Sequence, residues 1–199
     1  SVVGGTRKGS YRFGVNYYKD EAVVPTQDYD RIAINGSLDQ SITDWLKVGF
    51  STNTNYTRSH GNQIGLYSIL QLTPILSPYA ADGTEIERAE MPLDQVYLLT
   101  KNNINKLSDR WVNENFGFGS YNNAYMEVKF PWVEGLSFKE TASMNYRNSK
   151  NGSFTGSGVN DFNATSPNNA SISQNETKNW TIESLLTYDH VFAEKHHVN

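Results

Sequence analysis

The feature that most constrains this chain is an alternation of apolar and polar residues that recurs along its length. In the run that starts at Leu46, apolar side chains alternate with Lys47, Gly49 and Asn53. Successive side chains of an extended strand point to opposite faces, so a period of two predicts strands with one apolar and one polar face. Similar runs start near Tyr11, Arg31, Tyr125, Leu136 and Trp180.

The length of these runs favours strands that cross a membrane. They last about 9–13 residues, whereas ordinary soluble strands most often have about 5–6 residues and tilted membrane strands need about 9–11. The apolar share of 37% is thin for one large core. It suits strands that are apolar on one face only. A membrane-spanning helix needs about 18 or more consecutive apolar residues, and no stretch of this chain approaches that length.

The connections between the runs alternate in length. Short links are expected at residues 5–8, 41–44, 131–135 and 193–196, and longer ones at residues 20–28, 59–119 and 149–178. An up-and-down membrane barrel has this pattern because its turns are short on one side of the membrane and long on the other. We therefore expect an all-β, antiparallel up-and-down transmembrane β-barrel segment. Residues 1–199 would be one domain, with 59–119 and 149–178 as long extracellular loops.

Large aromatic residues are predicted at both ends of the apolar faces, as in the ring girdles at membrane–water interfaces. The expected girdle comprises Tyr17, Tyr56, Tyr146 and Trp180 beside the long links, and Phe130, Trp132 and Phe192 beside the short ones. Glu140 is the exception, since it falls on an apolar face where a carboxylate is costly. A β-bulge is one way to turn it to the polar face.

The polar faces would line the lumen of such a barrel. The expected lumen-lining residues are Arg12, Asn16, Arg31, Lys47, Asn53, Glu127, Lys129, Arg147 and Glu183. Their mixed signs suit neutral, hydrogen-bonding cargo better than one type of ion.

Signals for catalysis or cofactors are weak. The chain has no cysteine, and His60 and His190 have no partner at metal-ligand spacing. The adjacent His196 and His197 are interpreted as a solvated pair. No nucleophile–base pair or phosphate-binding loop is visible, and the net charge of −4 without a basic run argues against nucleic acid. We expect no enzyme, no metal and no cofactor.

Several short motifs, in this order and spacing, resemble the SusC/RagA family of TonB-dependent outer-membrane transporters. The motifs are Gly4-Gly5-Thr6, Tyr29-Asp30-Arg31, Asp44-Trp45-Leu46-Lys47-Val48-Gly49, Thr73-Pro74, Ser77-Pro78, Asp82-Gly83, Gly135-Leu136-Ser137-Phe138-Lys139, the strand from Trp180 to Tyr188, and His196-His197. The resemblance spans nearly the whole chain. It implies a barrel of about 22 strands, of which this chain would be one stretch, since bare strand edges are not tolerated in hydrocarbon. A plug domain and an energy-coupling box are not recognisable in it.

The resemblance also implies a function. It implies import of glycans or peptides across the outer membrane of a Gram-negative, Bacteroidetes-like cell. A SusD-like surface lipoprotein would cover the barrel, and TonB would act through parts outside this segment. Candidate cargo-stacking rings are Tyr67, Tyr97, Trp111 and Tyr121, because ring faces suit the apolar faces of sugars. The alternative is that these rings only pack loops or extend the girdle.

Two other functions stay open from the sequence. A soluble carbohydrate-binding β-sandwich would need a second sheet over the apolar faces. A passive porin-like barrel would share the strand pattern, and only the family resemblance separates it from an active transporter.

Overall fold

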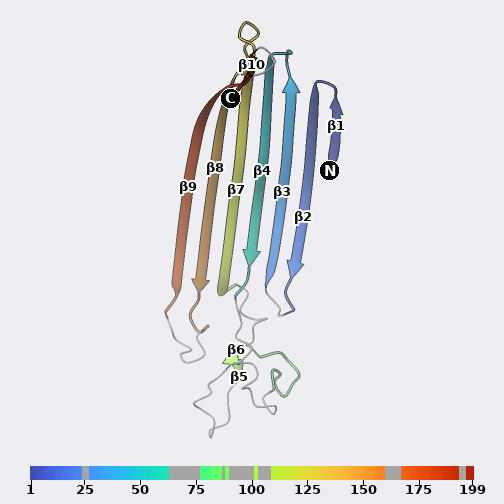
Figure 1. Ribbon diagram of the computed structural model, residues 1–199. Coiled ribbons are helices and arrows are strands. Elements are labelled where there is room, and N and C mark those ends of the chain that lie inside the picture. Colours follow the sequence, from blue (N-terminus) through green and yellow to red (C-terminus); the bar gives the residue numbers. More distant parts are fainter. Residues whose placement is uncertain are drawn as a thin grey trace.

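One antiparallel sheet dominates the computed structural model, which describes residues 1–23, 27–62, 77–86, 88–89, 101–102, 109–159, 167–192 and 196–199. Figure 1 shows its strands side by side in the order β1-β2-β3-β4-β7-β8-β9. Their bounds are Val2–Thr6 (β1), Gly9–Glu21 (β2), Asp28–Ser41 (β3), Leu46–His60 (β4), Trp111–Lys129 (β7), Leu136–Thr155 (β8) and Asn169–Tyr188 (β9). Each strand pairs with the next of the sheet in chain order, so the all-β, up-and-down expectation is confirmed.

Two short strand pairs lie outside this sheet. Strand β5 (Arg88–Ala89) pairs with β6 (Lys101–Asn102), and β10 (His190–Phe192) pairs with β11 (His196–Val198). The described residues contain no helix that is long and apolar enough to cross a membrane.

The pairing register carries the two-faced pattern from strand to strand. Tyr17 pairs with Ile32, Ile32 with Tyr56, and Tyr56 with Phe118, so one row of apolar side chains crosses four strands. A one-residue slip at any pair would move a whole strand's apolar side chains to the polar face. This row of the apolar face is therefore unbroken from β2 to β7.

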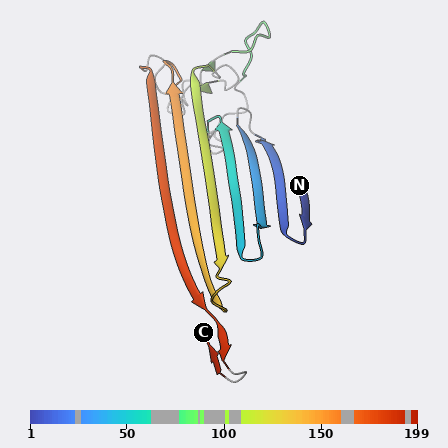
Figure 2. The ribbon, with the colours of Figure 1, turned by 90° about the horizontal axis from the view of Figure 1, so that it is seen from above.

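No second layer covers this apolar face within the described residues. Figures 1 and 2 show the long strands as one layer, with β1 at one edge and β9 at the other. Trp180 on β9 is 74% exposed, and the described hydrophobic side chains that are buried are Ala33 and Val159. A soluble protein rarely exposes so large an apolar surface. The β-sandwich interpretation is wrong for this part of the chain.

Tight turns join the strands at one end of the sheet. The turn from β7 to β8 bends at Gly135, which has a φ of 85°. Most side chains avoid this conformation, whereas glycine adopts it freely. The amide of Asp189 donates a 2.9 Å hydrogen bond to the carbonyl oxygen of Gly135, and a β-carbon at residue 135 would overlap the Asp189 carbonyl oxygen. This turn therefore has room only for glycine.

The strands run further than the sequence pattern predicts. Strands β7, β8 and β9 have 19, 20 and 20 residues. The loop ranges 59–119 and 149–178 were too wide, because β7 begins at Trp111, β8 ends at Thr155 and β9 begins at Asn169. In these extensions Glu114, Lys150 and Gly152 stand on the otherwise apolar face. These residues interrupt the alternation of apolar and polar side chains, but the pairing of the backbone continues through them.

Glu140 keeps its place on the apolar face. It pairs with Met126 on one side and Ser184 on the other, and the register runs through it without an inserted residue. The interpretation that a bulge turns it inward is wrong. Instead, the hydroxyl of Ser184 donates a 2.5 Å hydrogen bond to Oε2 of Glu140.

A small polar cluster also lies on the apolar face, across β4 and β7. The hydroxyl oxygens of Thr54 and Ser120 are 2.8 Å apart, although the two residues are 66 positions apart in the chain. The side-chain amide of Asn122 donates a 2.9 Å hydrogen bond to the same Ser120 oxygen. These polar groups satisfy one another.

Candidate transport surface

The polar face of the sheet brings together all nine residues predicted to line a lumen. Lys47 of β4 stands opposite Glu127 of β7, and Arg31 of β3 stands opposite Thr57. The other predicted lumen residues occupy positions of the same parity relative to these pairs. The structure therefore places them on one face, and the identity of that face as a lumen stays a prediction.

A row of amide side chains crosses the middle of this polar face. It runs through five strands, with each member opposite the next: Asn35, Asn53, Tyr121, Asn145 and Asn179. We call this set the amide row. Sequence analysis predicted Asn53 and Tyr121 separately, whereas the register shows them as direct neighbours.

The amide row is free to bind something else. Within the described residues, none of its four asparagine side chains makes a hydrogen bond. Tyr121 is 49% exposed between them. An amide offers two donors and an acceptor, and a tyrosine ring adds an apolar surface with a polar end. The row can therefore bind a neutral, polar ligand.

A second polar cluster lies toward the short-turn end and was not predicted. The hydroxyl of Tyr125 donates a hydrogen bond to Oδ1 of Asp39. The Nζ atoms of Lys47 and Lys139 lie 5.6 Å and 4.8 Å from the centre of the Tyr125 ring, within reach of a cation–π attraction. The ring lies over Gly49, where a β-carbon would overlap it.

Replacing Gly49 by alanine tests this cluster. The added methyl would displace the Tyr125 ring and break its hydrogen bond to Asp39. Overpacking of this kind costs about 1–3 kcal/mol, so we expect the urea midpoint of the folded protein to fall accordingly. Gly14→Ala is the matched control, because Gly14 lies on the same face and the nearest atom to its added β-carbon is 3.5 Å away. Equal midpoints for the two variants would contradict the proposed contact.

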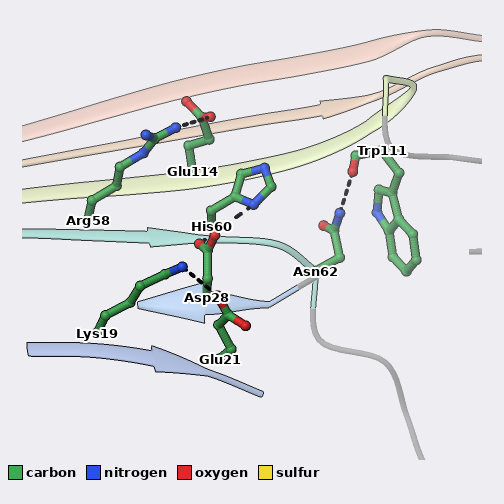
Figure 3. Close-up of polar contacts among 8 residues, drawn as sticks. All are labelled: Lys19, Glu21, Asp28, Arg58, His60, Asn62, Trp111 and Glu114. Carbon is green, nitrogen blue, oxygen red and sulfur yellow. Dashed lines mark hydrogen bonds and ion pairs between the residues drawn. The ribbon is translucent and has the colours of Figure 1, made fainter. Parts of the chain in front are cut away.

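The four candidate cargo-binding rings do not form one group in the described structure. Tyr67 and Tyr97 lie outside the described residues. Trp111 begins β7, and its carbonyl oxygen accepts a 2.6 Å hydrogen bond from the side-chain amide of Asn62 (Figure 3). Tyr121 lies ten positions further along the same strand, about 33 Å away at the usual rise per residue. Of the four, only Tyr121 has a mid-sheet polar setting in this part of the chain.

Charged and titratable side chains follow the aromatic residues at the loop-side end of the apolar face. Arg58 contacts Glu114 at 3.2 Å, and Nδ1 of His60 lies 3.7 Å from Oδ1 of Asp28 (Figure 3). Arg58 comes two residues after Tyr56 of the predicted girdle. The apolar face thus ends at an aromatic row followed by charges, the order expected at a membrane–water interface.

The structure shows where the predicted girdle residues of the short-turn end lie. The rings of Phe130 and Trp132 are 5.7 Å apart in the β7–β8 turn. Phe192 lies on β10, in the separate hairpin, with its ring 4.5 Å from that of His190. Their role at an interface stays a prediction.

Part of the long link between β4 and β7 forms a small hairpin of its own. Tyr79 bridges to Glu85, with Gly83 at a φ of 82° in the bend. The backbone amide and the hydroxyl of Thr84 donate hydrogen bonds of 2.9 Å and 2.6 Å to Oδ1 of Asp82. These hydrogen bonds favour the charged carboxylate and lower the pKa of Asp82 below its usual value. No group of three or more acidic or histidine side chains among the described residues is arranged to hold a metal ion.

We compared the sequence and the fold of the chain with those of known proteins. No protein-family model matches the chain. Its sequence is similar to three TonB-dependent receptors of Formosa agariphila. Receptor P26 is 25% identical over 206 residues, with 100% of this chain and 19% of the relative covered. Receptor P3 is 25% identical (96% and 19% covered), and receptor P39 is 26% identical (98% and 18% covered).

Two solved structures share the fold. The RagAB peptide importer in its closed-closed state gives a TM-score of 0.70, and the RagAB peptide transporter gives 0.72. Each is 17% identical, with 98% of this chain and 22% of the other covered. The chain has the fold of a barrel segment like that of the RagAB structures, and it is similar in sequence to TonB-dependent receptors. This barrel segment spans about a fifth of the length of the relatives that it matches. They are named as receptors and importers, not as enzymes.

Proposed function

We propose that this segment forms part of the wall of an outer-membrane importer. The observation that carries the proposal is the two-faced sheet: a mainly apolar face that ends at aromatic rings and charged side chains, backed by a polar face. In a closed barrel the apolar face would contact lipid and the polar face would line a wet lumen. Residues 1–199 would belong to one barrel domain, with the links from β4 to β7 and from β8 to β9 on the extracellular side.

The cargo we propose is a neutral polar oligomer, either a glycan or a peptide. The amide row supports this, because side-chain amides hydrogen-bond hydroxyl and peptide groups without requiring charge. Both RagAB structures are described as peptide importers or transporters, which supports the peptide alternative. We further propose a SusD-like surface lipoprotein as the partner that captures cargo and TonB as the source of energy, as the family resemblance implies.

A gel experiment on the native source tests the membrane assignment. An antibody against residues 150–178 would be used on fractions run with and without boiling. We expect a band far larger than this chain, in the outer-membrane fraction, that shifts on heating as folded barrels do. A heat-insensitive band in the aqueous fraction would contradict the proposal.

Substituting the amide row tests the cargo surface. In the full-length transporter, the double variant Asn53→Ala and Asn145→Ala would remove two hydrogen-bonding neighbours of Tyr121. We expect uptake of a labelled neutral oligosaccharide or oligopeptide at limiting concentration to fall about thirtyfold, since two lost hydrogen bonds cost about 1 kcal/mol each. Ser51→Ala, on the same face of β4, is the control. Equal uptake by the double variant and the control would exclude a cargo role for the row.

Planar-bilayer recording separates active import from passive diffusion. A plugged transporter shows no steady conductance until the plug moves, whereas a porin-like barrel conducts continuously. A stable open conductance of the full-length protein would favour the passive alternative.

A further inference from the structure

A groove crosses the loop-side ends of β7, β8 and β9 on the face that carries the apolar side chains. Its volume is about 330 Å³. Neither the cargo surface nor the aromatic girdle includes it. Its lining on that face consists of Val112, Glu114, Phe116, Lys150, Gly152, Phe154, Ala170 and Ile172.

The groove exists because Gly152 leaves its centre open. Gly152 stands between Glu114 of β7 and Ile172 of β9 in the register. A β-carbon at residue 152 would have no atom within 4 Å. Apolar side chains rise around this gap, and Ile172 is 74% exposed at its edge. The groove is therefore a recess with apolar walls.

After the pairing of its carboxylate is taken into account, the groove carries a positive charge. The carboxylate of Glu114 is paired with Arg58 at 3.2 Å, as Figure 3 shows. Lys150 makes no ion pair with another residue in the described ranges. An apolar recess beside an unpaired ammonium group suits a ligand that has both apolar surface and an anionic group.

The position of the groove indicates where such a ligand comes from. On β8, Lys150 and Gly152 lie four and six residues beyond Tyr146 of the girdle, about 13–20 Å along the strand. If the girdle marks the edge of the hydrocarbon, the groove lies outside the head-group layer of a phospholipid bilayer, which is about 5–8 Å thick on each side, in the zone above it. The sugars and phosphates of an outer-leaflet glycolipid lie in that zone.

We infer that this groove binds the sugar–phosphate head group of an anionic glycolipid of the outer leaflet. Phe116, Phe154 and Ile172 would contact the apolar faces of sugar rings, and Lys150 would pair with a phosphate. This inference rests on the proposed membrane location of the segment. A protein partner would have to cover much of the surface around the recess as well, because a stable interface buries about 800 Å² on each side.

Binding of lipopolysaccharide to the full-length transporter tests the inference. The purified protein would be placed in nanodiscs of phosphatidylethanolamine and phosphatidylglycerol, and labelled lipopolysaccharide would be titrated in. We expect saturable binding, weakened at least about tenfold by Lys150→Glu, which reverses the charge at the phosphate position. Gly152→Leu should have a similar effect, because leucine would fill the recess without a clash.

The control is Asn151→Leu, the adjacent residue on the polar face, which should leave binding unchanged. Each variant would first be shown to keep its heat-dependent shift on a gel, so that misfolding is excluded. Equal lipopolysaccharide binding by all variants would overturn the inference. The inference would also be overturned if Gly152→Leu lost association between protein copies but kept its lipopolysaccharide binding, because that result would identify a protein interface. Cargo uptake is measured separately, so a result that contradicts the glycolipid site does not contradict the proposed import function.

Discussion

Replacing Phe50 by arginine is expected to destabilise the folded barrel by about 2–4 kcal/mol, the cost of a cationic side chain near the middle of a bilayer. Phe50 lies on the apolar face of β4, opposite Leu38 and Ala124. It is six positions before Tyr56 of the girdle. An arginine there would have to leave water for hydrocarbon without a carboxylate directly opposite it.

The next residue provides the matched control. Ser51 lies on the polar face of the same strand, opposite Ser37 and Asn123. Ser51→Arg should change the free energy of unfolding by less than about 1 kcal/mol, as surface substitutions usually do. Urea unfolding of the full-length protein in lipid vesicles, followed by tryptophan fluorescence, compares the two variants. Similar costs at Phe50 and Ser51 would show that the apolar face does not contact lipid.

The second large effect is expected at Gly135. An alanine there would have to adopt a positive φ, at a cost of about 1–2 kcal/mol, and its methyl would overlap the carbonyl oxygen of Asp189. Relief of that overlap would move the turn between β7 and β8, at a further cost of about 1–3 kcal/mol. Gly135→Ala should therefore lower the stability of the full-length barrel by about 2–5 kcal/mol.

Alanine variants of two other glycines distinguish the cost of the backbone conformation from the cost of the overlap. Gly83 has a φ of 82° and open space around it, so Gly83→Ala would report the cost of the conformation alone. Gly152 lies in a strand with open space, so Gly152→Ala would report neither cost. Thermal unfolding should rank the losses as Gly135, then Gly83, then Gly152. A loss at Gly135 no greater than at Gly83 would mean that the contact with Asp189 does not constrain the turn.

The faces of the strands were predictable from sequence because they depend only on a period of two. The expected lumen residues share one face, and apolar residues such as Phe50 and Ile182 share the other. The strand ends were harder to predict. Beyond the girdle no hydrocarbon contacts the outer face, so selection for alternation weakens there. Residues such as Glu114 and Gly152 broke the pattern while backbone pairing continued to Thr155.

The neighbours across strands could not be predicted from sequence. Alternation fixes the face of a residue, but a slip of two positions keeps every face and changes every neighbour. The contact between Tyr125 and Asp39 joins residues 86 positions apart, and the amide row depends on the register between β4 and β7. The long link between these strands carries no signal that sets this register. Tyr121 was therefore identified as a single ring and not as the centre of a row.

The hydrogen-bonded cluster of Thr54, Ser120 and Asn122 has a consequence for the order of assembly. Each of these groups would be costly alone in hydrocarbon, because lipid offers no replacement for the water that it loses. Thr54 and its hydrogen-bond partner Ser120 lie on neighbouring strands, 66 positions apart in the chain. Strands β4 and β7 should therefore pair before lipid surrounds them. On this account the wall enters the bilayer as a preformed hairpin-linked sheet, not one strand at a time.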